Sequence, residues 1–185
     1  MIEIKNLSFS FGDKVIFDNF SLEIPHKSVT AITGKSGCGK STLINLICGL
    51  LKADKGEIIS DAKSYAVVFQ EDRLLPWLTV RENVSIVSDD KTADLWLKKV
   101  GLSESAELYP SQLSGGMKRR TALARALAYG SDVLILDEAF NGVDEETKSV
   151  LMDIIKEQAK EKAVILISHN SDEIQRLADK IYSLD

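Results

Sequence analysis

A glycine-rich stretch at residues 34–41 combines the residue types that bind phosphate. It fits the pattern G-x-x-x-x-G-K-[ST] of nucleoside triphosphate-binding loops, and its residues are Gly34, Lys35, Ser36, Gly37, Cys38, Gly39, Lys40 and Ser41. Glycines let backbone N–H groups turn towards phosphate oxygens that side chains would keep away. We expect Lys40 to neutralise the β- and γ-phosphates, Ser41 to ligate Mg²⁺ and Thr42 to donate to the α-phosphate. A glycine turn ahead of a core helix is the alternative interpretation.

Two adjacent acids, Asp137 and Glu138, follow an apolar run that begins at Val133. Asp137 lies 97 positions after Lys40 (137 − 40), and a carboxylate at the end of a buried strand can hold a Mg²⁺-bound water. Glu138 points elsewhere, where it can act as the general base that activates the attacking water. Adjacent acids also end strands without any function, so this prediction depends on the glycine loop.

A second glycine-rich turn, Ser114-Gly115-Gly116, lies between the glycine loop and the two acids. It opens a run with helical periodicity, and a helix start attracts anions through its free N–H groups and its partial positive charge. Residues 34–42 already offer one phosphate cradle in the same chain. The second helix start therefore predicts a site that is completed by another subunit.

Strand-like runs and helical periodicities alternate along the chain and position these residues. The run Val29–Thr33 leads into the glycine loop, and a helical pattern from Lys40 to the stop at Gly49 follows it. The runs Val133–Leu136 and Ala163–Ser168 suit strands that are buried on both faces of a parallel sheet. Further strands are expected at Ile2–Ile4, Phe20–Ile24, Gly56–Ser60, Tyr65–Gln70 and Lys180–Leu184. This alternation predicts a doubly wound α/β core.

The stretch from Leu74 to Pro110 differs from the rest because it has few β-branched runs and a polar middle. With its helical segment Thr92–Val100, it predicts a small helical lobe inserted into the core. A strong helix is expected at Ser114–Tyr129. Another is expected at Glu145–Lys162, with these apolar side chains facing inward: Val150, Leu151, Ile154 and Ile155.

Composition limits the classes of protein to which the chain can belong. With 44% hydrophobic and 28% charged residues, its 185 residues fit one globular domain and not a disordered protein. A net charge of −5 argues against a nucleic-acid partner. The cysteines, Cys38 and Cys48, lack the companions of a zinc site and fit a reduced, cytosolic protein. No window approaches the ~18 apolar residues of a membrane span, so no direct membrane insertion is expected.

The order of these motifs resembles that of ABC-type ATPases along essentially the whole chain. The turn after Leu113, followed by Met117 and the helix to Leu127, is similar to the signature motif of that family. The resemblance implies a single ATP-binding domain at residues 1–185 with the α/β fold of a P-loop NTPase. It further implies a mixed central sheet, an N-terminal antiparallel β subdomain and a small helical subdomain inserted at approximately residues 74–118.

The resemblance also implies roles for four residues outside these motifs. Phe11 is expected to stack on adenine, and Gln70 to reach the Mg²⁺ site and link it to the helical lobe. Asp144 resembles the aspartate of the loop that crosses the dimer interface, and His169 the histidine that contacts the γ-phosphate. Taken singly, each has an ordinary alternative as a core aromatic, a surface polar residue or a loop histidine.

The function implied by the resemblance is that of an ATP-hydrolysing subunit, with ATP and Mg²⁺, that drives the import of a small solute. The expected partners are transmembrane permease subunits, a solute-binding protein and a second copy of the chain in an ATP-dependent head-to-tail homodimer. The expected location is cytoplasmic, on the inner face of the cell membrane through the permease. An ABC-type ATPase of a soluble assembly or division complex is the alternative. Glu138 and His169 disfavour a regulatory module with little turnover.

The stretch Gln70–Val80, which contains Pro76 and Trp77, narrows the subclass. It is similar to the segment found in the ATPases of nitrate, taurine and aliphatic-sulfonate importers, and Met117 fits that subset too. In those complexes the segment faces a transmembrane partner. The alternative is that its apolar side chains merely pack the lobe onto the core.

Three residues depart from those common in the family, and they are Ala139, Asn141 and Asn170. Ala139 and Asn141 leave the detail of the dimer interface near Asp144 open. Because the last expected strand lies near residue 184, no C-terminal regulatory domain is expected.

Overall fold

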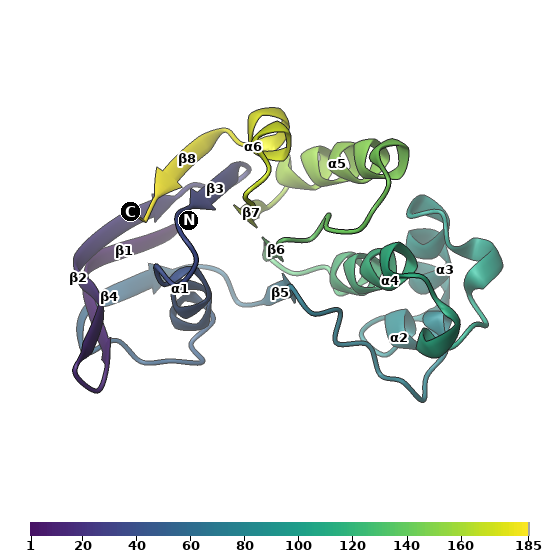
Figure 1. Ribbon diagram of the computed structural model, residues 1–185, viewed down its shortest axis with the longest axis horizontal. Helices are drawn as coiled ribbons and strands as arrows, with labels where there is room; N and C mark the ends of the chain where they lie inside the picture. Colours follow the sequence, from purple (N-terminus) through teal and green to yellow (C-terminus); the bar gives the residue numbers. More distant parts are fainter. Residues whose placement is uncertain (185) are drawn as a thin grey trace.

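Two β-sheets, one antiparallel and one parallel, form the strand layers of the computed structural model, which describes residues 1–184 (Figure 1). The antiparallel sheet contains β1 (Ile2–Phe11), β2 (Lys14–Ile24) and β4 (Lys55–Ser60) in the order β2-β1-β4. Gly12 and Asp13 form the expected turn between β1 and β2. Both strands are longer than the sequence pattern predicts, because bulges interrupt their alternation of apolar and polar residues.

The parallel sheet has the strand order β5-β6-β7-β3-β8. Its strands are β3 (Val29–Thr33), β5 (Tyr65–Val68), β6 (Val133–Asp137), β7 (Ala163–Ile167) and β8 (Lys180–Ser183). Every strand pair in it is parallel. The expected α/β fold of a P-loop ATPase is confirmed, but the strands expected in one mixed central sheet are divided between this parallel sheet and the separate antiparallel sheet.

Both faces of the parallel sheet are buried, as the aliphatic runs predict. In β6, Leu134 and Leu136 pack into one hydrophobic core, whereas Val133 and Ile135 pack into the other. The second core also receives the apolar face of the antiparallel sheet and the helix α1 (Lys40–Ile47). The strand that ends in the two acids is therefore fixed from both sides.

The helix α5 (Glu145–Ala159) covers the parallel sheet together with α6 (Ser171–Leu177), which the sequence reasoning missed (Figure 1). Leu151 and Ile155 are buried as expected, but Val150 is half exposed, so its inward placement is wrong. The reason is geometric: neighbouring helical positions point about 100° apart, so Val150 and Leu151 cannot face the same way.

Three helices pack together at the other end of the molecule (Figure 1). They are α2 (Val80–Ser85), α3 (Asp90–Lys99) and α4 (Gly115–Ala128), joined by the 3₁₀ turns Ser103–Ser105 and Pro110–Gln112. The sequence pattern missed α2 because it is short and polar; a capping box between Thr79 and Glu82 starts it. The helix α4 runs on without a break to lie beside β5.

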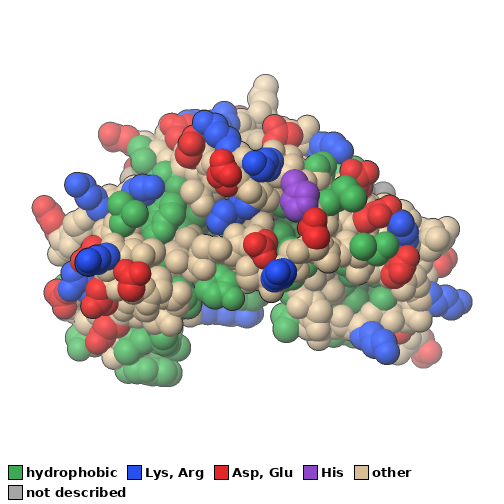
Figure 2. Space-filling model, turned by 180° about the vertical axis from the view of Figure 1, so that it is seen from behind, with side chains coloured by type: hydrophobic (Ala, Val, Ile, Leu, Met, Phe, Trp, Pro, Cys, Tyr) green, Lys and Arg blue, Asp and Glu red, His purple; other side chains and the backbone are tan. Residues whose placement is uncertain are grey.

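The surface shown in Figure 2 carries acidic and basic side chains side by side, and apolar side chains gather along its lower edge. A continuous basic stripe of the kind that follows nucleic-acid phosphates is not present on this face. Within residues 1–184, no helix is long and apolar enough to cross a membrane.

Candidate active site

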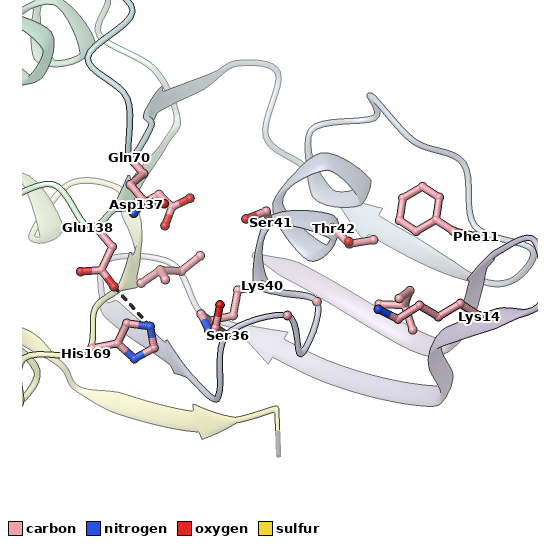
Figure 3. Close-up of a pocket in the computed structure, with 14 residues that line it drawn as sticks. Phe11, Lys14, Ser36, Lys40, Ser41, Thr42, Gln70, Asp137, Glu138 and His169 are labelled. Carbon is pink, nitrogen blue, oxygen red and sulfur yellow. Dashed lines mark ion pairs between the residues drawn. The ribbon is translucent and has the colours of Figure 1, made fainter.

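A cavity of about 360 Å³ lies where the carboxyl ends of the parallel strands meet the β1–β2 hairpin (Figure 3). Ligands of open α/β sheets bind at such strand ends. The sequence-predicted residues that line it are Phe11, Ser36, Gly37, Gly39, Lys40, Ser41, Thr42, Gln70, Asp137, Glu138 and His169. Gly34, Lys35 and Cys38 belong to the same loop but do not line the cavity. The structure thus brings together residues that lie up to 158 positions apart (169 − 11).

The backbone of the glycine loop adopts conformations that are readily accessible only to glycine. Gly37 and Gly39 have φ angles of 82° and 107°, in the left-handed region that other residues avoid. A Cβ atom at Gly39 would also lie 2.7 Å from Cγ2 of Ile16. Gly39 is the N-cap of α1 and offers no side chain to the first amides of that helix. These amides stay available to an anion in the cavity.

The side chain of Lys40 reaches back across the glycine loop. Its Nζ donates hydrogen bonds to the carbonyl oxygens of Gly34 and Lys35, at 2.6 Å and 2.8 Å. The ammonium group is therefore held at the mouth of the phosphate cradle, where an incoming phosphate can take the place of the carbonyl oxygens.

The two acids at the end of β6 lie in different surroundings. Burial raises the pKa of Asp137, against the lowering effect of the positive charges of Lys40 and Arg119 and of His169. Burial also raises the pKa of Glu138, and the charge of Glu173 adds to that rise. A raised pKa makes a carboxylate a better proton acceptor at neutral pH.

Glu138 itself has a strained backbone. Its φ is 53°, a left-handed value that is rare in residues other than glycine, asparagine and aspartate. The N–H of Glu138 donates to the carbonyl oxygen of Ile167 at 2.9 Å and holds the strained residue against β7. Strain of this kind accumulates at functional sites, and here it turns the side chain of Glu138 towards His169 (Figure 3).

Glu138 and His169 lie next to each other on one side of the cavity (Figure 3). The Nε2 atom of His169 lies 3.5 Å from Oε1 of Glu138. That oxygen is buried and accepts no hydrogen bond from any residue in the range 1–184. A buried carboxylate oxygen without a donor is poised to accept a proton or a water hydrogen.

Gln70 is held in the cavity by Arg119, a residue that the sequence reasoning did not single out. Arg119 is only 7% exposed, and its guanidinium donates to the carbonyl oxygens of Phe69 and Gln70 at 2.6 Å and 2.5 Å. It also lies 3.2 Å from a carboxylate oxygen of Asp72. An arginine in the run that follows the second glycine turn was visible in the sequence, but its partners lie some 50 positions away.

The β1–β2 hairpin contributes two lining residues that were also missed, Lys14 and Ile16. Lys14 pairs with Phe11 across the turn, so both side chains border the cavity (Figure 3). Phe11 is half exposed and makes an edge contact with Phe9, with the ring centroids 4.8 Å apart. The exposed ring does not pack in the core, so that alternative is wrong for Phe11.

Residues 114–116 and Asp144 do not line the cavity. Ser114 caps α4 by accepting a hydrogen bond from the N–H of Met117 at 3.2 Å, and Asp144 caps α5 through the N–H of Thr147 at 2.9 Å. The two caps are neighbours, since a Cβ atom at Gly116 would lie 2.9 Å from the carbonyl oxygen of Gly142. Ser114, Gly115 and Asp144 are all exposed.

The cavity fits a magnesium–nucleotide complex in the kind of oxygen ligands that it offers. The hydroxyl of Ser41, the amide of Gln70 and the carboxylate of Asp137 all line it. Residues 1–184 contain no cluster of three or more acidic, histidine or cysteine ligands that could hold a metal on its own. Mg²⁺ typically takes one or two protein ligands and completes its shell with phosphates and waters.

Comparisons with known proteins agree with this geometry. A family model described as "ABC transporter" matches residues 17–141. The chain is 36% identical to the intermembrane phospholipid transport system ATP-binding protein MlaF of Haemophilus influenzae, over 98% of this chain and 79% of that protein. It is 35% identical to the aliphatic sulfonates import ATP-binding protein SsuB 1 of Pseudomonas syringae pv. syringae, over 98% of this chain and 79% of that protein.

Solved structures with the same fold include dimers. The ATP-binding cassette MJ0796, in a dimeric post-hydrolysis state bound to ADP and phosphate, superposes with a TM-score of 0.90. It is 28% identical, and the superposition covers 100% of this chain and 94% of that one.

Proposed function

Since the chain belongs to the ABC transporter family of ATP-binding subunits, we propose that it is the ATPase that energises import of a small solute through a membrane permease. The family assignment accounts for ATP binding and hydrolysis. The direction of transport and the class of solute are the proposal. The convergence of Lys40, Asp137, Glu138 and His169 on one cavity supports the ATPase role, and the segment at residues 70–80 with the similarity to SsuB supports import.

In the proposed mechanism, the glycine loop and Lys40 bind the phosphates of ATP and offset their negative charge. Glu138 accepts a proton from the attacking water, because its buried Oε1 has no hydrogen-bond donor and its pKa is raised. His169, 3.5 Å from that oxygen, orients Glu138 and contacts the terminal phosphate. When bound, Mg²⁺ would supply charge neutralisation, with Ser41, Gln70 and Asp137 as its protein ligands. Phe11 would stack on the adenine ring.

We propose that the site is completed by a second copy of the chain. Ser114, Gly115 and Gly116 lie outside the chain's own cavity but open the helix α4 at the surface, next to Asp144. A head-to-tail pair places the turn of one copy over the nucleotide of the other, and twofold symmetry makes the two sites equivalent. The lobe that carries this turn then spans approximately residues 74–118, which include α2, α3 and the first turn of α4.

Import is favoured by the segment that precedes α2. Trp77 is 69% exposed, so the alternative that it packs the lobe onto the core is wrong for this residue, although Leu74 does pack against the core. An exposed tryptophan suits contact with a permease. The same proposal implies a solute-binding protein as a partner and a location on the cytoplasmic face of the membrane. The similarity to SsuB supports a sulfonate-like anion as the solute.

The test is recovery of the partner from detergent-solubilised membranes with the tagged chain. We expect a permease to be recovered, and to be lost with Trp77→Glu but not with Ile181→Glu, a matched change at another exposed apolar residue. Recovery of soluble partners alone would support an assembly or division complex instead.

Phospholipid transport is a second candidate, because MlaF proteins match the chain as closely as SsuB proteins do. Reconstitution of the recovered complex in vesicles separates the two. ATP-dependent uptake of a labelled alkanesulfonate supports import, whereas ATP-dependent movement of a labelled phospholipid between membranes supports the second candidate.

A further inference from the structure

Three polar side chains close to the turn that carries His169 are buried but lie outside the lining of the cavity. Glu173 is 2% exposed, Lys148 is 7% exposed and Ser168 is 1% exposed. None of them lines the cavity. Burying a carboxylate and an ammonium group is costly, and apolar residues of similar size would often be equally stable there. Their presence calls for a role that apolar residues could not fill.

The contacts of Ser168 show what the carboxylate of Glu173 does. The Ser168 hydroxyl donates to Oε2 of Glu173 at 2.6 Å, and it accepts a hydrogen bond from the N–H of Asn170 at 3.0 Å. These two bonds fix the residues on both sides of His169. The carboxylate orients the hydroxyl so that its lone pair faces the Asn170 N–H, which an apolar residue could not do.

Glu173 is itself held from two directions, through its backbone N–H and through its carboxylate. Asn170 caps α6 and accepts from the N–H groups of Asp172 and Glu173, at 2.9 Å and 3.3 Å. From the other side, Nζ of Lys148 lies 3.8 Å from Oε1 of Glu173. The position of Glu173 is therefore set by the start of α6 and by α5 together.

Lys148 connects this arrangement to the start of α5. Its Nζ donates to Oε1 of Glu145 at 2.7 Å. Glu145 is the first residue of α5 and follows the cap Asp144, next to the surface at which we place the second subunit. The buried groups thus link that surface to the turn that carries His169.

We propose that Glu173, acting through Ser168, is a positioning residue that holds His169 at Glu138, and that Lys148 ties this position to the start of α5. This inference rests on the proposed function through the role given to His169. An imidazole that is 57% exposed has few contacts of its own to fix it. The hydrogen bonds of Ser168 and Asn170 fix the backbone on both sides of His169 and so set the direction of its side chain.

The first experiment follows the imidazole directly by NMR of the full-length chain. The chain has two histidines, so His26 serves as an internal reference. We expect Ser168→Ala to move or broaden the ring Cε1–H signal of His169 and to leave that of His26 in place. Asp172→Asn, a change at an exposed acid in the same helix, is the matched control and should produce a much smaller displacement.

A second variant guards against a folding defect. Glu173→Leu combined with Lys148→Met removes both buried charges together, so no unpaired charge remains between them. We expect the same displacement of the His169 signal. An unchanged His169 signal in a folded Ser168→Ala or double variant overturns the inference.

The second experiment measures hydrolysis and asks whether Ser168 acts through His169. We expect Ser168→Ala to lower kcat roughly 10-fold, as small misplacements of catalytic groups do, while KM for ATP stays within about twofold. In a His169→Ala background the same change should have no further effect. An equal loss in both backgrounds overturns the inference. Neither readout requires a permease, so a failure of the import proposal leaves them unaffected.

Discussion

The molecule contains two glycine-rich helix starts that use glycine in opposite ways. In the loop at residues 34–41, glycines adopt left-handed φ angles and leave the first amides of α1 without a cap. In the turn at residues 114–116, neither glycine has a positive φ, and Ser114 caps α4 with its own hydroxyl. The first start, at residues 34–41, is a concave site within the chain that we call the cradle. The second, at residues 114–116, is capped and lies at the surface, and we call it the knob.

The difference shows why a similar composition gives two kinds of site. At Gly39 the missing Cβ makes room for Ile16 and permits a backbone that other residues avoid. At Gly116 it permits close approach of the backbone at Gly142, so the turn and the loop before Asp144 form one surface. The cradle has its chemistry in the same chain, whereas the knob, in the function that we propose, acts on the cavity of a second copy.

The largest expected effect comes from disabling the chemistry beside the cradle while leaving the knob intact. Glu138→Gln removes the proton acceptor, and loss of a general base typically lowers turnover by about 10²–10⁴-fold. ATP still binds, so dimers should form with ATP and persist. Steady-state phosphate release and light scattering measure the two effects. A variant that stays monomeric with ATP would contradict the shared site.

The next largest effect comes from the cradle itself. Lys40→Ala removes a charged donor to the phosphates, and such a bond contributes about 1.5–3 kcal/mol, which corresponds to roughly 10- to 100-fold in affinity. Calorimetric titration of the monomer with ATP measures it. Lys14→Ala, at the opposite wall of the cavity, is a comparison that should cost less. Unchanged affinity in Lys40→Ala would contradict the assignment of the cradle.

A mixing experiment tests whether cradle and knob belong to different subunits in one site. Lys40→Ala and Ser114→Arg chains should each be nearly inactive alone. Random mixing makes about half of the dimers mixed, each with one intact site of two, so activity returns to about a quarter of the wild-type value. Mixtures that remain inactive would show that the knob does not act across subunits.

The smallest effect concerns the pH dependence of Glu138. Burial raises its pKa, so the carboxylate stays protonated to a higher pH than an ordinary glutamate, and activity falls as pH drops through that raised value. Asn141 donates to Glu138 at 3.4 Å and lowers its pKa. Asn141→Ala should move the acid limb of the kcat profile to higher pH. A shift to lower pH would contradict this account.

The same shift has a thermodynamic consequence that the rate profile does not report. Glu138 retains its proton to a higher pH in the folded chain than in the unfolded one. Between the two pKa values the folded state therefore binds more protons, and stability falls as pH rises. The strain and burial at Glu138 are thus a cost to the folded state at the pH at which the base is active.

Local patterns predicted the parts of the fold whose signals are local. Left-handed glycines, a buried aliphatic strand and a capping serine each leave a mark within a few residues, so the loop after β3, the strand β6 and the start of α4 could be identified. The helices α2 and α6 could not be identified, because each is shorter than two turns and draws its stability from packing and caps.

The residues that hold the site in place depend on distant contacts. Arg119 binds backbone carbonyls about 50 positions earlier, and Lys148 of α5 forms an ion pair with Glu173 of α6. Nothing near either residue in the sequence distinguishes it from a surface cation. The left-handed φ of Glu138 is likewise imposed by its bond to Ile167 on the neighbouring strand, and no local signal announces it.

The strand order has a consequence for when the cradle becomes competent. Val29 at the start of β3 pairs with Val164 in β7, 135 positions later (164 − 29). Contacts this distant form late, because a long loop must close before they can stabilise anything. During synthesis, β3 and the glycine loop after it are therefore made long before β7, the strand with which β3 pairs. Nucleotide binding should begin only after β7 has inserted, so ATP binding reports that β3 has gained this neighbour.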